Sequence, residues 1–324
     1  MRAAAVILVL LIVAAFPWAA GAQPGQHYLT GFPAVKQQHG LTCEAAAASM
    51  GTREAVTEAQ LMDAMPRNPN PYLGFRGNPD GVGGGLVDYG VYAPPLARAL
   101  ARYDFASAPL YHVRDSTLRA YIDRGWPVVV WITYGLKREQ PQLAGAGSDR
   151  LVLVPFEHVI LVTGYNSKTI TGNDPWLPAV VHYKWANFNR SWGYFGNMAL
   201  AIDPCALPST VSQLHFDAPD LPAAGAVWTW APGAHDTSYH VRIVEAGGDN
   251  PVVYNGTQTA TAYTLATARP GHTYQVTVWG MSPCGDASAP VSILSKVPRL
   301  EPTPLPPTPV LPTLTPAPTP TPTP

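Results

Sequence analysis

The chain has 324 residues, 47% of them hydrophobic and 13% charged, which is more than one ordinary domain needs and predicts two folded modules plus segments outside them. Twenty Lys and Arg nearly balance 21 Asp and Glu, and the net charge is −1. This balance provides none of the cationic field that nucleic acids and anionic lipids attract, so we expect no nucleic acid partner.

The first 22 residues have the pattern of a secretory signal. Arg2 precedes an apolar run over residues 3–19, and the small residues Ala20, Gly21 and Ala22 follow it, as at a cleavage point. An uncleaved membrane anchor is the alternative, because the run approaches the length that can begin to span a bilayer. The pattern predicts a signal peptide over 1–22 and a secreted or cell-surface protein.

Three cysteines are an odd number for an oxidising compartment, so at least one of them is unpaired or pairs between molecules. The economical pairing joins Cys205 to Cys284 and leaves Cys43 free. Sequence alone does not fix this geometry, and the disulfide stays one of the alternatives.

Residues 26–203 contain helix signals first and strand signals afterwards, an order typical of an α+β domain. A capping box at Thr57 opens a short helix that Pro66 stops. Pro94 and Pro95 start a second helix, and Asp115 is expected to cap a third. Apolar and alternating runs predict strands over 127–133, 159–162, 169–172, 180–183 and 195–202.

Residues 211–298 alternate at period two between turn signals, which predicts a small β-sandwich. The predicted strands are 227–230, 239–244, 252–254, 262–265, 274–279 and 291–294. The segment resembles a fibronectin type III domain in its Trp228 or Trp230, its strand from Tyr239 and its Pro270-Gly271 turn before Tyr274. The resemblance implies that the Tyr274 hydroxyl bonds back to the preceding loop, and it suggests contact with a cell surface or an extracellular polymer.

Residues 299–324 consist mostly of Pro and Thr. Such a composition buries no core, so it predicts a disordered, extended tail that acts as a stalk or spacer.

The stretch around Cys43 carries the chemistry that we expect. Alanines 45–48 are strong helix formers, and Thr42 is an acceptable N-cap, so Cys43 is predicted as the first helical residue. The exposed amides and the dipole of a helix start favour a thiolate, which is the nucleophilic form. Gln37 lies six residues earlier, and its side-chain amide, with the backbone N–H of Cys43, would hold the oxyanion of a tetrahedral intermediate.

A base for this thiol is available at the start of a buried strand. His158 precedes the strand at Val159, and Asp174 ends the next strand. If the two strands form a hairpin near Asn166, the carboxylate comes beside the imidazole, where it would fix the tautomer and stabilise the cation.

The order of these residues resembles that of the peptidase C39-like proteins, which are relatives of papain. The resemblance covers about residues 28–203 and rests on Gln37, Cys43-Glu44-Ala45, Gly125-x-Pro127-Val128-Val129, the run 158–165 and Asp174-Pro175. It implies a papain-like fold with a Cys43–His158–Asp174 triad and Gln37 at the oxyanion site. The chain departs from the family's more frequent Cys-Gly-Pro, and it lacks the transporter segments of members that process bacteriocin leaders.

Several alternatives stay open at this point. Gln38 competes with Gln37 and Asn173 with Asp174, while His39 could also approach Cys43. Cys43, His39, His158 and Asp174 could in principle bind zinc, although no paired ligand spacing supports it. The glycine-rich stretch 81–85 lacks the context of a phosphate loop and is expected to form a wall or lid of the cleft. Phe75, Tyr89 and Tyr92 are candidates to line substrate subsites, with core packing as the alternative for at least one of them. Trp176 is a candidate to shield the triad.

The sequence favours an exported cysteine peptidase or amidase that hydrolyses a peptide bond through a thioester at Cys43. We expect a peptide or protein substrate, no cofactor, no metal and a monomer. The alternative is a non-catalytic extracellular protein that binds a peptide or glycan in the papain-like cleft.

Overall fold

A computed structural model describes residues 25–145, 150–217, 225–247, 249 and 251–299. The described residues divide into two compact units, one within residues 25–208 with 282–287 and one within residues 209–281 with 288–299. The predicted signal peptide (1–22) and the predicted tail (299–324, except for Arg299) lie outside the described residues.

The first unit is built on an antiparallel sheet with the strand order β2-β9-β3-β6-β7-β8, to which β1 adds by pairing with β6. The strands are β1 (His27–Tyr28), β2 (Phe105–Leu110), β3 (Val128–Thr133), β6 (Glu157–Tyr165), β7 (Thr169–Asp174), β8 (Ala179–Lys184) and β9 (Ala199–Ala206). A separate small hairpin joins β4 (Gln142–Ala144) to β5 (Leu151–Leu153). The predicted strands at 127–133, 159–162, 169–172 and 180–183 are confirmed.

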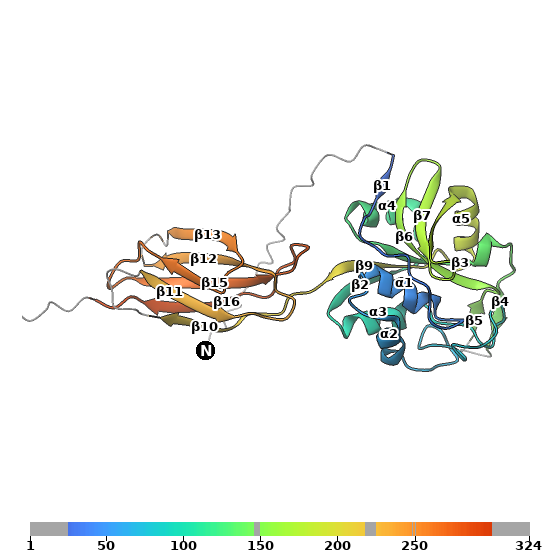
Figure 1. The fold of residues 1–324 in the computed structure, drawn as a ribbon, viewed down its shortest axis with the longest axis horizontal. Helices are drawn as coiled ribbons and strands as arrows, with labels where there is room; N and C mark the ends of the chain where they lie inside the picture. The colour runs from blue at the N-terminus through green and yellow to red at the C-terminus, as the bar shows by residue number, and fades with distance from the viewer. Residues whose placement is uncertain (1–24, 146–149, 218–224, 248, 250, 300–324) are drawn as a thin grey trace, which may run out of the picture. The chain divides into compact units, whose positions relative to one another are not determined.

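Helices cover both faces of this sheet, so the central strands are buried on both sides (Figure 1). The helices are α1 (Cys43–Gly51), α2 (Glu58–Ala64), α3 (Ala93–Ala101), α4 (Asp115–Asp123) and α5 (Trp185–Gly193), and a short 3-10 turn, η1, spans Tyr134–Leu136. Side chains of α1, α2 and α3 share one apolar cluster with the sheet, whereas those of α4 and α5 share a second one. The continuous apolar runs of β3 and β6 follow from this double burial.

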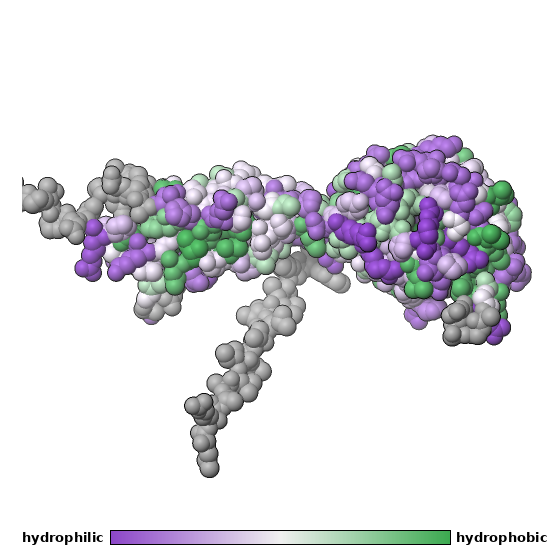
Figure 2. All heavy atoms as spheres, turned by 90° about the horizontal axis from the view of Figure 1, so that it is seen from below, coloured by the Kyte–Doolittle hydropathy of each residue, from purple (hydrophilic) through white to green (hydrophobic). Residues whose placement is uncertain are grey.

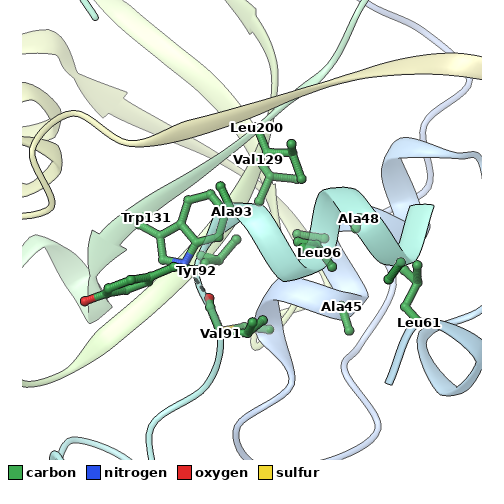
Figure 3. Packing of buried hydrophobic residues seen from close by; sticks show 14 of the residues in the cluster. Ala45, Ala48, Leu61, Val91, Tyr92, Ala93, Leu96, Val129, Trp131 and Leu200 are labelled. Atoms are coloured by element: carbon green, nitrogen blue, oxygen red, sulfur yellow. Dashed lines mark hydrogen bonds between the residues drawn. The ribbon is translucent and has the colours of Figure 1, made fainter. Parts of the chain in front are cut away.

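Trp131 of β3 anchors the cluster on the α1 side (Figure 3). Its side chain is fully buried, and its indole N–H donates to the backbone oxygen of Val91 at 3.0 Å, so burial leaves no polar atom of the ring unpaired. Ala45 and Ala48 of α1 lie near Leu96 of α3 in the same cluster. Small side chains on α1 let its backbone approach the sheet, and this fixes the helix start where Cys43 lies.

Two helix starts differ in detail from the prediction. Thr57 forms the predicted capping box with Gln60. Thr42 occupies the N-cap position of α1, but its hydroxyl bonds to Glu58 and to the His39 carbonyl instead of capping the helix. Asp115 is the first helical residue of α4 rather than its cap.

The last strand of the sheet begins later than predicted. The expected strand over 195–202 is instead β9 (Ala199–Ala206), because Gly196 and Asn197 have positive φ values of 61° and 51° and form a turn after α5. Helix α5 and the edge strand β2 had no prediction.

The second unit is the predicted β-sandwich, with a sheet of order β10-β11-β14 and one of order β13-β12-β15-β16. The strands are β10 (Ser212–Asp217), β11 (Ala226–Ala231), β12 (Ser238–Ala246), β13 (Val252–Gln258), β14 (Ala262–Leu265), β15 (Thr273–Met281) and β16 (Val291–Lys296). Trp228 packs between them, and the Tyr274 hydroxyl accepts a hydrogen bond from the Arg269 backbone N–H at 2.9 Å. The bond from this tyrosine to the preceding loop, which the resemblance implied, is therefore present.

Cys205 and Cys284 form a disulfide across 79 residues, and Cys43 is the free thiol. In the view of Figure 2, hydrophilic residues cover much of the first unit's visible face, and hydrophobic ones occupy smaller areas. Within the part of the chain that the structure describes, no helix has the length and apolar character to cross a membrane.

Candidate active site

The start of α1 and the hairpin of β6 and β7 meet at one cavity of about 390 Å³. Gln37, Cys43 and His158 line it, together with Trp176 and residues of the glycine-rich stretch 81–85. Residues far apart in the sequence therefore share one cavity, because α1 packs on β6 while the β6–β7 hairpin brings Asp174 back beside the strand start.

His158 and Asp174 form the imidazole–carboxylate pair that was predicted from the hairpin of the two strands. His158 Nε2 lies 2.9 Å from Asp174 Oδ1, and both side chains are buried. Burial alone would raise the pKa of Asp174, but hydrogen bonding to His158 and the backbone N–H groups of Trp176 and Leu177 outweighs it and lowers the pKa. Because Nε2 is occupied by an ionised carboxylate, Nδ1 is the ring nitrogen left for a thiol or substrate.

Two aromatic side chains enclose this pair. The Tyr134 ring packs edge-on against His158 with centroids 5.4 Å apart, and it also meets the Trp176 ring at 6.5 Å. Trp176 is 42% exposed, lines the cavity and donates its backbone N–H to Asp174 Oδ1 at 2.8 Å. The Tyr134 ring thus packs against the imidazole of His158, and the Trp176 backbone helps to hold its carboxylate partner.

Gln37 is held at the cavity by hydrogen bonds to two backbone carbonyl groups. Its backbone N–H donates to the Pro175 carbonyl at 2.9 Å, and its side-chain Nε2 donates to the His39 carbonyl at 2.7 Å. Nε2 carries two hydrogens, so one N–H is left to serve an oxyanion. Glu58 of α2 fixes the same loop by accepting from the Gln38 backbone N–H at 2.9 Å.

Cys43 lines the cavity and is only 4% exposed. Its thiol donates to Glu44 Oε2 at 3.4 Å, and no hydrogen bond joins it to His158 among the residues that the structure describes. Burial, then the negative charges of Glu44 and Glu157, raise the pKa of the thiol well above its usual value, and a hydrogen bond from the Val159 backbone opposes them only in part. The prediction that the helix start lowers this pKa is wrong, because burial and the two carboxyls raise it.

Two acidic residues near the thiol had no role in the sequence prediction. Glu44 is fully buried, and its Oε1 accepts from the Val91 backbone N–H at 2.5 Å. A carboxyl oxygen of Glu44, a carboxyl oxygen of Glu157 and the sulfur of Cys43 lie within 4.8 Å of one another. Burial raises the pKa of Glu44 to about 7, and burial with the charge of Glu44 raises that of Glu157 well above its usual range. A single charge in a run of predicted helical alanines is the signal that could have pointed to Glu44.

The alternatives from the sequence have other places in the structure. Gln38 is exposed and away from the cavity lining, and His39 bonds to Asp80 at 2.8 Å. Asn173 donates to the backbone oxygens of Phe32 and Pro33, which is a structural role. Among the described residues, no cluster with metal-ligand spacing combines Cys43 with His39, His158 or Asp174.

The glycine-rich stretch forms part of the cavity wall, as predicted. Gly84 has a φ of +89°, and a Cβ there would meet the Phe156 ring at 2.8 Å, so only glycine lets this wall approach the ring. By contrast, Phe75, Tyr89 and Tyr92 are buried in the core and do not line the cavity, and the prediction that they form subsites is wrong. Tyr89 and Tyr92 instead share a hydrogen bond between their hydroxyls at 2.8 Å.

Comparison with known proteins identifies the family of the first unit. The model of the Peptidase_C39 like family matches residues 29–200, which is more than half of the chain. The chain belongs to this family. The matched region contains every residue of the cavity described above. No curated protein matches the chain.

Several solved structures are similar to parts of this chain. A Bacillus anthracis protein named as a C39-like peptidase is 20% identical and covers 55% of this chain and 97% of its own, with a TM-score of 0.49. An Fn3-like protein from Clostridium thermocellum is 24% identical and covers 29% of this chain and 97% of its own, with a TM-score of 0.23. The domain FN3tt is 14% identical over 29% of this chain and 97% of its own, with a TM-score of 0.25.

Proposed function

We propose that the protein is an exported cysteine peptidase or amidase that hydrolyses a peptide bond through a thioester at Cys43. The observation that carries the proposal is the buried pair of His158 and Asp174, 2.9 Å apart, on the same cavity as the only free thiol. An imidazole oriented by a carboxylate is the arrangement that activates a thiol and later protonates a leaving amine. Membership of the Peptidase_C39 like family supports the same reaction class.

In the proposed mechanism, the S–H bond of Cys43 turns from Glu44 toward His158, and Nδ1 of the imidazole accepts the proton. The sulfur attacks the scissile carbonyl carbon, and the oxyanion is stabilised by the free N–H of Gln37 and the backbone N–H of Cys43. His158 then protonates the departing amine, which leaves a thioester. Water activated by the same imidazole hydrolyses the thioester and restores the thiol.

The raised pKa of Cys43 favours a second candidate, a non-catalytic protein that binds a peptide or glycan in the cavity. Alkylation by iodoacetamide separates the two. For a peptidase, His158→Ala lowers the rate of Cys43 alkylation several-fold, because the imidazole stabilises the thiolate. For a binding protein, the substitution does not change the rate of alkylation. Cys43 is the only free cysteine, so the reagent reports on this sulfur alone.

Hydrolysis itself is tested with a peptide library read by mass spectrometry. We expect cleavage by the wild type, none by Cys43→Ser, and a loss in kcat of a hundredfold or more for Asp174→Asn, which keeps the shape but favours the wrong tautomer. An exposed matched variant, Asp63→Asn, should cleave like the wild type. Cleavage that survives Cys43→Ser would refute the mechanism.

We also propose that the protein acts outside the cytoplasm, as a monomer. The signal-peptide pattern of residues 1–22 and the disulfide of Cys205 and Cys284 support export, since disulfides persist in oxidising compartments. The β-sandwich is proposed to contact a cell surface or extracellular polymer, with the Pro/Thr tail as a spacer. Fractionation of the source cells with an antibody tests the location, and light scattering of the purified protein tests the monomer.

A further inference from the structure

The cavity contains two hydrogen-bond acceptors that receive no donor. Oε1 of Gln37 and Oε1 of Glu157 are both buried, and neither has a partner among the described residues. Both residues line the cavity, and Gln37 as a whole is 5% exposed. A buried polar atom without a partner costs about 1–3 kcal/mol, so such atoms in folded proteins call for a ligand or a functional reason. The occupant of this cavity must therefore bring donors.

The surroundings of Glu157 narrow the chemistry of those donors. Its carboxyl lies with that of Glu44 and the sulfur of Cys43 inside a 4.8 Å cluster, which is an environment of negative potential once either acid ionises. The cavity also contains Lys137, but its Nζ lies over the Phe156 ring at 3.9 Å, and no ion pair joins it to Glu157 in the described part of the chain. Among the residues that the structure describes, no cation pairs with this acid.

We propose that Glu157 forms a subsite for a positively charged group of the substrate, a primary ammonium, bound next to Cys43. The ammonium could belong to a lysine side chain or to a free peptide N-terminus, which have the same chemistry. It would donate to Oε1 of Glu157 and form a charge-assisted hydrogen bond, which is stronger than one between neutral groups. The inference rests on the proposed function for the position of the scissile bond, but the subsite itself is defined only by its distance from the Cys43 sulfur.

Charged methanethiosulfonate reagents test the subsite without any turnover. In each reaction the Cys43 thiolate attacks the sulfenyl sulfur, a disulfide forms, and methanesulfinate leaves with the electron pair of the broken S–S bond. The three reagents carry a 2-aminoethyl, a methyl or a 2-sulfonatoethyl group, that is, a cation, a neutral group or an anion. Each rate is divided by the rate of the same reagent with glutathione, so that intrinsic reactivity cancels.

We expect the wild type to favour the cation over the neutral reagent by about tenfold and to disfavour the anion. Glu157→Gln keeps the shape and should bring the ratio close to one, whereas the exposed control Glu54→Gln should keep it. Equal normalised rates in the wild type would overturn the proposal whether or not any variant folds. A preference that disappears with Glu44→Gln but persists with Glu157→Gln would overturn the assignment to Glu157.

Peptides that protect Cys43 from iodoacetamide distinguish the two sources of the ammonium. The set at equal concentration is acetyl-Ala-Lys-Ala-amide, Ala-norleucine-Ala-amide with a free N-terminus, and the neutral acetyl-Ala-norleucine-Ala-amide. Stronger protection by the first indicates a lysine side chain, and stronger protection by the second indicates an N-terminus. Equal protection by all three refutes the subsite. Failure to find hydrolysis would refute the proposed function but leave these binding results unchanged, so the two failures are distinguishable.

Discussion

Replacing Glu44 by Gln should make the Cys43 thiol more acidic. Glu44 accepts the thiol hydrogen at 3.4 Å, and its negative charge opposes the formation of a thiolate. A glutamine fits the same space: its oxygen can keep the hydrogen bond from the Val91 backbone, and its amide N–H can then donate to the sulfur. The substitution therefore removes a repulsion and adds a donor, and both changes favour the thiolate.

The size of the effect follows from the distance. Two unit charges 3.4 Å apart in an effective dielectric constant of 20 repel by about 5 kcal/mol, an upper limit of about three to four pKa units. Glu44 has a pKa of about 7, so near neutral pH it is charged only part of the time, and relaxation reduces the effect further. Glu157, Glu58 and Tyr92 also lie close enough to influence Glu44, and they are unchanged in the variant. We expect the pH at which half of the Cys43 thiol is ionised to fall by at least about one pH unit in Glu44→Gln.

The assay is the rate of alkylation by iodoacetamide as a function of pH, followed at Cys43 by mass spectrometry. The wild type should react slowly at pH 7 and faster at high pH, whereas Glu44→Gln should react about tenfold faster at pH 7. Glu54→Gln removes an exposed carboxylate and serves as the matched control. A midpoint that stays the same or rises in Glu44→Gln would show that Glu44 does not hold the thiol neutral.

Three further predictions concern stability. The pKa of Glu44 is raised from 4.5 to about 7, so between these pH values the folded state holds a proton that the unfolded state has lost. The free energy of unfolding should therefore fall by about 3 kcal/mol between pH 4.5 and 7. Urea titrations measure this fall, and Glu44→Gln should flatten it. Gly90→Ala places a Cβ 2.1 Å from Glu44 Oε1 at a φ of +132°. We expect the free energy of unfolding, measured in urea, to fall by about 2 kcal/mol, and an unchanged value would contradict the prediction. Tyr274→Phe removes the acceptor of the Arg269 backbone N–H and should lower the free energy of unfolding by about 1 kcal/mol while leaving Cys43 alkylation unchanged.

Patterns within short stretches of the sequence were enough for much of the architecture. The capping box at Thr57, the proline pair that starts α3 and the apolar run of β3 each depend on neighbouring residues, so the sequence predicted them correctly. The hairpin of β6 and β7 also closes locally, which is why the pairing of His158 with Asp174 follows from the order of the strands alone. The edge strand β2 lacks a continuous apolar run and was missed, whereas the other edge strand, β8, was predicted from its own residues.

The sequence by itself determined which residues are candidates for the chemistry, since a sulfur, an imidazole and a carboxylate at the ends of predicted elements are visible in one dimension. Only the tertiary structure decided the electrostatic state of the sulfur. Glu44 follows Cys43 directly, but its effect depends on a carboxyl 113 residues away, at Glu157, and on the backbone at Val91. Burial by packed segments sets the cost of a charge, and no local pattern records which segments will pack together.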